Sequence, residues 1–509
     1  MLSRRSFTIL SFAFVSIVVL ALTSRRLGDW SFSDGPYYRH GHDRPPGGPR
    51  PPPPPPPPPG GPNGTGPPYG DAPWDPGFVP GNDDLPPRPN HDPMCESFPD
   101  TSNILLVMKT GATESFDRIP TQIMTVLKCL PDFLIFSDME QRIGGYHIHD
   151  SLETVLEEAK EGNSDFDLYR RQKACPVDQV NCQKLGDPAS EGWNLDKYKN
   201  IHIAEKAYRM RPGYDWYVFI DADTYVLWPN MVQWLRQMRP SKKRYLGSVT
   251  LINDFSFGHG GSGYVVSRAA MEESVGKNPG IANKYDVRAK SECCGDYLFA
   301  LAVKETSKIS VEQVWPTING EKPNTLPFGP THWCHPIVTM HHMNSEEISS
   351  FWDFERRRYA AQNMPSAPLP LTIKDIYTEF LAPKLVAKRE DWDNLSDDWY
   401  YLDASSPNHE WEDWRVGRAK KDEDKSALEK RAHLSFDDCR RACESVGDCF
   451  QFRWQDECCG MSRAFMLGKP VKKESKPKKR SMSGWDVQKI QKWVAEQGEC
   501  SSIDWPAVS

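Results

Sequence analysis

Two aspartates one residue apart, Asp221 and Asp223, have the chemistry and the spacing to bind a cation. They follow the apolar run 216–220, which is rich in aromatic and β-branched residues and is therefore predicted to be a buried strand. Carboxylates at the carboxyl end of a strand in an open α/β sheet lie where ligands bind. Two hard oxygen donors there suit Mg²⁺ or Mn²⁺, which neutralise a diphosphate, whereas a solvated turn is the alternative for the tripeptide alone. Asn230 is expected to cap the helix that follows.

A glycine-dense segment downstream favours a cation site over a solvated turn. It contains Gly260, Gly261 and Gly263. Backbone without Cβ atoms can approach a sugar or a diphosphate closely. A strand is predicted directly after it, over 264–266, and Ser267 is expected to cap the next helix.

The elements that must position these residues begin with a strand–helix–strand unit. Residues 104–108 and 133–136 are predicted strands, and a helix is predicted over 119–130 between them. So short a repeat of strand, helix and strand indicates a parallel βαβ unit and hence an α/β fold. A helical stretch over 193–210 and a further strand over 244–251 are also expected.

The Asp-x-Asp string and the segment 260–267, in this order and spacing, resemble glycosyltransferase family 31, which includes the fringe proteins and the core 1 β1,3-galactosyltransferases. The resemblance implies a GT-A fold, with a Rossmann-like mixed sheet, over about 100–358. It also implies an inverting transferase that moves galactose or a related hexose from a UDP donor to an acceptor hydroxyl on a glycan or glycoprotein, forming a β-linkage. The middle position is commonly Asp in that family and is Ala222 here.

The same resemblance implies roles for individual residues. Asp221, Asp223 and His341 are the expected ligands of Mn²⁺ or Mg²⁺, with His341 in a segment like the family's Val-Ser-Phe-His and His342 directly beside it. Asp296 is the expected general base, although the family has Glu-Asp where this chain has Gly-Asp. A helix start lowers the pKa of a carboxyl group, so burial or the acceptor must compensate for a base at Asp296. The donor site is expected to hold Thr110, Gly111, Arg118, Lys197, Asp221 and Gly261.

Ordinary structural roles are the alternatives for several of these residues. An Asp before an apolar helix is otherwise an amino-terminal cap, and exposed Arg118 and Lys197 would otherwise be solvated. A second class of function also stays open, namely an inactive luminal carbohydrate-binding or adaptor protein that kept the fold. Ala222 and the Gly-Asp at Asp296 favour that class.

Thirteen cysteines indicate disulfides and an oxidising compartment, and their odd number leaves at least one thiol free or paired between chains. Cys175 and Cys182 are close enough for a small disulfide loop. Asn63 and Asn394 begin glycosylation sequons. The net charge of −7 is mild and includes no basic field, so no nucleic-acid partner is expected.

Five of the cysteines lie close together near the carboxyl end. Cys439 and Cys443 are four residues apart on a predicted helix, and Cys449, Cys458 and Cys459 follow. This pattern resembles a PAN/apple module, a small disulfide-stapled fold that binds proteins or carbohydrate. A unit of that size needs such staples for stability, so the cysteines are structural first.

The segment His332-Trp333-Cys334-His335 could indicate zinc, but its spacings match no common zinc framework.

The amino end carries an apolar run between two arginine pairs, near the minimum length for a membrane span. A cleaved signal peptide is the alternative, but the flanking basic pairs favour an uncleaved anchor. The expected protein is a single-pass type II protein of the Golgi (or ER) membrane with a luminal catalytic domain. Its predicted parts are a cytosolic tail (1–5), a transmembrane signal-anchor (6–23), a Pro/Gly-rich stem (24–99), the GT-A domain (100–358), a linker or extension (359–427) and the PAN/apple-like module (428–500).

Overall fold

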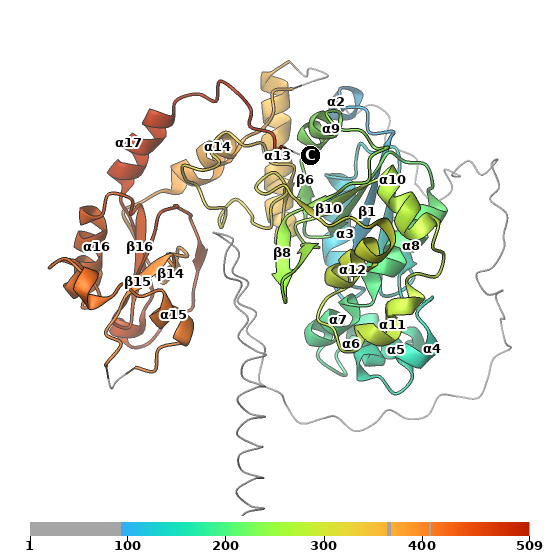
Figure 1. The fold of residues 1–509 in the computed structure, drawn as a ribbon, viewed down its shortest axis with the longest axis horizontal. Helices are drawn as coiled ribbons and strands as arrows, with labels where there is room; N and C mark the ends of the chain where they lie inside the picture. Colours follow the sequence, from blue (N-terminus) through green and yellow to red (C-terminus); the bar gives the residue numbers. More distant parts are fainter. Residues whose placement is uncertain (1–92, 364–367, 407–408, 508–509) are drawn as a thin grey trace, which may run out of the picture.

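The computed structural model describes residues 93–363, 368–406 and 409–507, which form two units, each built on its own sheet (Figure 1). The larger unit contains an eight-stranded mixed sheet, and the carboxyl-terminal unit contains a five-stranded sheet. The predicted signal-anchor and nearly all of the predicted stem lie outside the described residues. Within the described ranges, no helix combines the length and the apolar character that crossing a bilayer requires.

The larger unit begins with the predicted βαβ unit. Strand β1 (Ile104–Lys109) pairs in parallel with β2 (Phe133–Ser137), and α3 (Ser115–Met124) connects them. Strand β5 (Trp216–Asp221), which carries the Asp-x-Asp, pairs in parallel with β1 on its other side. The predicted βαβ unit and the predicted strand before Asp221 are thereby confirmed, although α3 ends at Met124 rather than at 130.

The full strand order is β11-β7-β10-β5-β1-β2-β4-β3. The sheet is mixed because β10 (Tyr264–Ser267) runs antiparallel to both of its neighbours. The remaining strands of the sheet are β3 (Gln141–Ile143), β4 (Tyr146–Asp150), β7 (Tyr245–Gly247) and β11 (Glu312–Gln313).

Helices cover both faces of this sheet, as its continuous apolar strands require. Alternate residues of β1 enter different cores, with Leu105 packing on the side of α8 (Lys199–Met210) and α12 (Gly295–Ser307). Leu106 packs on the side of α9 (Trp228–Leu235) and α13 (Ser345–Ala361). Shorter helices are α2 (Pro93–Glu96), α4 (Glu157–Lys160), α5 (Asp167–Ala174), α6 (Gln179–Gln183), α7 (Pro188–Asp196), α10 (Arg268–Met271) and α11 (Asn283–Ala289).

Three local predictions differ from the structure. The strand expected over 244–251 is divided, because β8 (Val249–Ile252) leaves the sheet and pairs with β9 (Phe255–Gly258). The helical stretch over 193–210 is likewise two helices, α7 and α8. Asn230 lies inside α9 rather than capping it, and its amide donates to the carbonyls of Ile337 and Leu371.

The carboxyl-terminal unit has the antiparallel strand order β13-β19-β16-β17-β15. Helix α16 (Phe436–Ser445) is tied to it by the Cys439–Cys459 disulfide, and Cys443–Cys449 closes the turn after the helix. Its strands are β13 (Lys388–Glu390), β15 (Trp399–Tyr401), β16 (Gln451–Gln455), β17 (Cys458–Ser462) and β19 (Met482–Trp485), and β14 (Trp392–Asp393) pairs separately with β18 (Lys469–Pro470). Strands β13 to β15 come from the predicted linker, so this unit begins well before residue 428.

The two units share one hydrophobic core. Phe328 of the larger unit stacks on Phe465, and Trp333 meets the edge of Trp493 in α17 (Val487–Gln497). A disulfide between Cys334 and Cys500 joins them covalently. Helices α14 (Ile373–Ile376) and α15 (Asp413–Gly417) belong to the segment that connects the two units and continues into the second.

The cysteines in the described ranges form six disulfides and leave Cys458 as a buried free thiol, as the odd count requires. Cys175 and Cys182 form the expected small loop. Because Cys334 is bonded to Cys500, it is not available to a zinc ion. The sequon at Asn394 is not a modification site in this fold, since its side chain is fully buried and donates to two backbone carbonyls.

Candidate active site

The Asp-x-Asp lies where β1 and β5 end side by side. The register of the two strands puts Lys109 opposite Asp221. The Lys109 ammonium lies 3.3 Å from the Asp221 carboxylate and 2.7 Å from that of Asp196, which comes from the end of α7. Burial lowers the pKa of Lys109, but the two carboxylates outweigh it, so the pKa is raised and the side chain is a cation. Lys109 and Asp196 were missed from the sequence.

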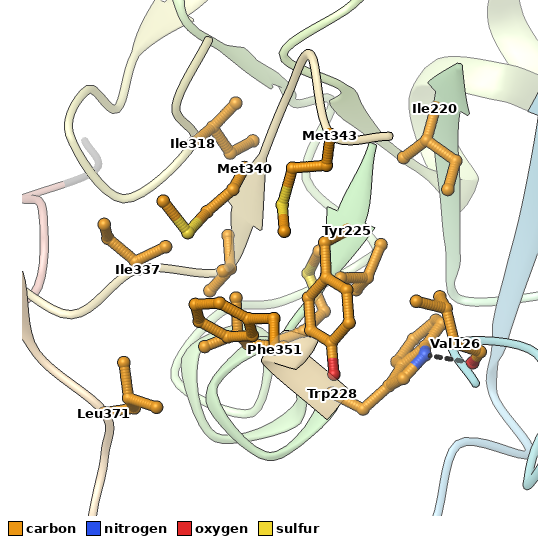
Figure 2. Packing of buried hydrophobic residues seen from close by; sticks show 14 of the residues in the cluster. Val126, Ile220, Tyr225, Trp228, Ile318, Ile337, Met340, Met343, Phe351 and Leu371 are labelled. Atoms are coloured by element: carbon orange, nitrogen blue, oxygen red, sulfur yellow. Dashed lines mark hydrogen bonds between the residues drawn. The ribbon is translucent and has the colours of Figure 1, made fainter. Parts of the chain in front are cut away.

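A two-stranded ladder brings the distant histidine segment to the Asp-x-Asp. Strand β6 (Tyr225–Val226) pairs antiparallel with β12 (Thr339–Met340), and the Met343 amide donates to the Asp223 carbonyl at 3.0 Å. Figure 2 shows the buried side chains of Tyr225, Met340 and Met343 gathered around this ladder. The pairing follows from the burial of these side chains in a common core, which holds the two backbone segments together.

The ladder places His341 against Asp223. The Nε2 atom of His341 lies 3.1 Å from one oxygen of Asp223, and Nδ1 of His342 lies 4.0 Å from the other. Candidate ligand atoms of the three residues all lie within 4.8 Å of one another. His341 is buried, and its Nδ1 has no hydrogen-bond partner among the described residues. One carboxylate and two imidazoles, of which His341 is buried and His342 is exposed, therefore fit a divalent cation such as Mn²⁺.

Asp221 does not belong to this group of three. Its carboxylate lies beside Lys109 instead, and burial raises its pKa. Burial acts on Asp223 in the same direction, but His341 and Arg118 oppose it and hold the Asp223 pKa well below its usual range. Asp223 is therefore the ionised carboxylate that faces the histidines.

The glycine segment fits between the histidine group and Asp296. A Cβ atom on Gly261 would lie 2.1 Å from Cε1 of His341, so only glycine fits there without moving the ring. The Gly261 carbonyl accepts a hydrogen bond from the Thr224 hydroxyl at 2.7 Å, which fixes the loop to the Asp-x-Asp turn. The neighbouring Gly260 amide donates to an oxygen of Asp296 at 2.7 Å.

Asp296 lies in the first turn of α12 but is not its capping residue, which is Cys294. Its second oxygen accepts the amide of Tyr297 at 2.8 Å. Burial is the largest influence on its carboxyl group and raises the pKa to about 6, against the opposing effect of the two amide donors and of Lys109. The burial that a base at this position requires is therefore present. A disulfide between Cys293 and Cys294 directly precedes the helix.

The expected donor residues are divided between two places. Thr110 and Gly111 form the turn directly after β1, and the buried Lys199 ammonium donates to the Thr110 carbonyl at 3.1 Å. Arg118 reaches the same region, where it donates to the Met343 carbonyl at 3.2 Å. Lys197 does not join this group, because its ammonium pairs with Asp165 at 2.8 Å.

A small cavity lies between these groups. Its walls include Lys109, Asp221 and Gly260, together with Asn200 of α8 and Tyr264 of β10. Gly260 therefore lines this cavity together with Asp221 and also bonds to Asp296.

Comparison with known protein families finds a match within the larger unit. Residues 169–313 match the family model described as Fringe-like, and the match contains the Asp-x-Asp, the glycine segment and Asp296. The match supports a glycosyltransferase of the fringe type, and the mixed sheet with its disulfides is compatible with a GT-A-like fold. No curated protein matches the chain.

Proposed function

We propose that this protein is an inverting, metal-dependent glycosyltransferase that moves a hexose, such as galactose, from a UDP donor to an acceptor hydroxyl on a glycan or glycoprotein, forming a β-linkage. The observation that supports it most is that two adjacent glycines connect the two groups. Gly261 lies against His341 of the Asp223 group, and the amide of Gly260 donates to Asp296, beside the carboxyl ends of β1 and β5. This is where an open α/β sheet binds its ligands.

Asp223, His341 and His342 would hold Mn²⁺ (or Mg²⁺) in this account. The bound cation supplies positive charge against the diphosphate of the departing UDP. Asp221 is a contact for the donor rather than a second carboxyl ligand, because its carboxylate lies beside Lys109 and outside the group of three. The turn at Thr110 and Gly111 and the guanidinium of Arg118 complete the donor side.

Asp296 is the proposed general base. It accepts the proton of the acceptor hydroxyl while the oxygen attacks the anomeric carbon from the face opposite the leaving group. The new bond joins that oxygen to the anomeric carbon, and the bond from this carbon to the diphosphate oxygen breaks. UDP leaves with the bonding electron pair, so the configuration inverts. A carboxyl group with a pKa of about 6 is mostly ionised at neutral pH and still basic enough to accept the proton.

The remaining parts of the proposal concern location and acceptor. The run 6–23 anchors the chain as a single-pass type II protein of the Golgi or ER membrane, and 24–99 holds the catalytic unit away from the bilayer. The carboxyl-terminal unit, with its PAN/apple-like cysteine pattern, binds protein or carbohydrate and thereby helps to select the acceptor.

Release of UDP from a panel of UDP-sugars in the presence of Mn²⁺ tests the proposal, using a fragment that begins after the apolar run. A transferase releases UDP from at least one donor, and faster when an acceptor glycan is added. An adaptor that kept only the fold releases none from any donor. The full set of UDP-hexoses and UDP-N-acetylhexosamines is needed so that a negative result does not depend on one sugar.

A further inference from the structure

A second group of histidines lies at the far end of the large sheet, outside the proposed active site. Strands β3 and β4 form a hairpin whose turn, Gly144-Gly145, has positive φ at both glycines. Along β4 the side chains alternate, with Ile148 buried in the core and His147 and His149 half-buried on the opposite face. Two imidazoles two residues apart on one strand therefore point to the same side.

Glu140 completes the group from the adjoining strand. It directly precedes β3, and extending the hairpin register places it opposite His149. One of its oxygens contacts Nε2 of His147, and the other accepts the Asp150 amide at 3.2 Å, which holds the carboxylate in position. The His147 and His149 rings are 4.0 Å apart between centroids. Candidate ligand atoms of the three residues lie within 4.8 Å of one another.

The group is separate from the Asp223 site. Strand β3 lies three positions from β1 in the sheet order, which corresponds to about 14 Å at the usual spacing between strands. One cation cannot contact both groups over that distance. Glu140 and the two histidines are also outside the residues 169–313 that match the Fringe-like model.

We propose that Glu140, His147 and His149 form a second metal site, for a borderline transition-metal ion of the Zn²⁺ type. Two imidazole nitrogens and one carboxylate oxygen are a donor set that Zn²⁺ and Cu²⁺ accept, whereas Mg²⁺ and Ca²⁺ prefer all-oxygen sites. The Glu140 side chain is 55% exposed, so a water molecule or another ligand can reach a fourth position. The ion ties β3, the edge strand of the sheet, to β4 and so protects that edge from opening.

The test measures Zn²⁺ bound to the full chain, purified in detergent without a histidine tag. All proteins carry Asp223→Asn and His341→Ala, so that the first site does not contribute. After dialysis against limiting Zn²⁺, the parent is expected to retain one ion per chain by elemental analysis. His147→Gln and His149→Gln should each weaken Zn²⁺ binding by at least about 10-fold in a competition titration with a chromophoric chelator. Cu²⁺ bound in place of Zn²⁺ should show nitrogen hyperfine coupling in its electron paramagnetic resonance spectrum.

Two further variants keep the outcome interpretable. His433→Gln removes a histidine from the other unit and should leave Zn²⁺ binding unchanged. Glu140→Gln removes the charge but keeps the size of the side chain, so it should weaken Zn²⁺ binding without disturbing the fold. Melting curves in chelator identify any histidine variant that folds poorly. Zn²⁺ should also raise the melting temperature of the parent and not that of His149→Gln. A parent that retains no Zn²⁺, or histidine variants that bind it as tightly as the parent, would overturn the proposal and leave an ordinary Glu140–His147 pair.

Discussion

Asp296 is subject to two opposing influences at the scale of a single residue. Its position in the first turn of α12, with amide donors on both oxygens, favours the carboxylate. Burial favours the neutral acid and is the stronger of the two, so the pKa rises to about 6. The carboxyl group is therefore mostly ionised at pH 7 and largely protonated one to two pH units below 6. The rate of the reaction is thus expected to fall at acidic pH.

The dependence of kcat/KM on pH should follow the Asp296 carboxyl group. Activity should fall as the pH is lowered through about 6, because protonation removes the proposed base. Asp296→Asn should reduce turnover by about 10²- to 10⁴-fold at all pH values, while UDP still binds in the presence of Mn²⁺. Titration calorimetry with UDP is the control. If Asp296→Asn lost UDP binding with its fold intact, the residue would belong to the donor site and not to the base.

The two adjacent histidines should contribute unequally. His341 is buried and lies 3.1 Å from Asp223, whereas the His342 side chain is 44% exposed and lies 4.0 Å away. His341→Ala should therefore weaken Mn²⁺-dependent UDP binding about as strongly as Asp223→Asn, and His342→Ala should have a much milder effect. Binding of UDP measured across a series of Mn²⁺ concentrations checks this. The reverse ranking would show that His342 is the principal nitrogen ligand.

Among the helices and strands, the sequence predicted those whose formation depends mainly on residues near one another in the chain. Strands β1 and β5 are continuous apolar runs because both of their faces are buried, so they could be recognised without the structure, as could the carboxylates at the end of β5. The β6–β12 ladder could not, since two-residue strands more than one hundred residues apart leave no periodic signal. Lys109 and Asp196 were missed for a similar reason, because their pairing depends on how α7 meets the end of β1.

Gly261 packs so closely against His341, directly after β12, that one added methyl group should weaken metal binding. Gly261→Ala places a Cβ atom 2.1 Å from the His341 ring, so either the ring or the loop must move. We expect Mn²⁺ affinity to fall by at least about 10-fold, in proportion to a displaced ligand. Gly417→Ala is the matched control, because nothing lies within 4 Å of its added Cβ atom. Equal Mn²⁺ affinity in parent and Gly261→Ala would show that the ring is not held where the structure has it.

At the scale of the whole molecule, the two units are expected to unfold together. Phe328 and Trp333 of the larger unit pack on Phe465 and Trp493, and the Cys334–Cys500 disulfide closes a chain segment of 166 residues. The motifs and the cysteine pattern of the sequence predicted two domains, but they could not show this shared core, because the contacts are long-range and involve no motif. The carboxyl-terminal unit therefore contributes to the stability of the larger unit and is also a candidate binding module.

Removal of the inter-unit disulfide should lower stability more than removal of a local one. Cys334→Ser with Cys500→Ser should reduce the free energy of unfolding by about 2–4 kcal/mol, because the unfolded chain regains the freedom that a long loop closure removes. Cys175→Ser with Cys182→Ser opens a loop with a separation of only 7 residues and should have a smaller effect. Chemical denaturation followed by tryptophan fluorescence measures both. An equal loss of unfolding free energy in the two double variants would show that the Cys334–Cys500 disulfide stabilises the protein no more than a local disulfide does.

In the proposed function, Asp223 and its histidines hold the cation on which sugar transfer depends. The most direct measurement is the rate of UDP release from the preferred UDP-sugar as a function of Mn²⁺ concentration, in the parent and in Asp223→Asn. We expect no release of UDP in chelator, saturable activation by Mn²⁺ in the parent, and a curve shifted to higher Mn²⁺ in Asp223→Asn. Release that persists in chelator, or identical Mn²⁺ curves for the two proteins, would contradict it.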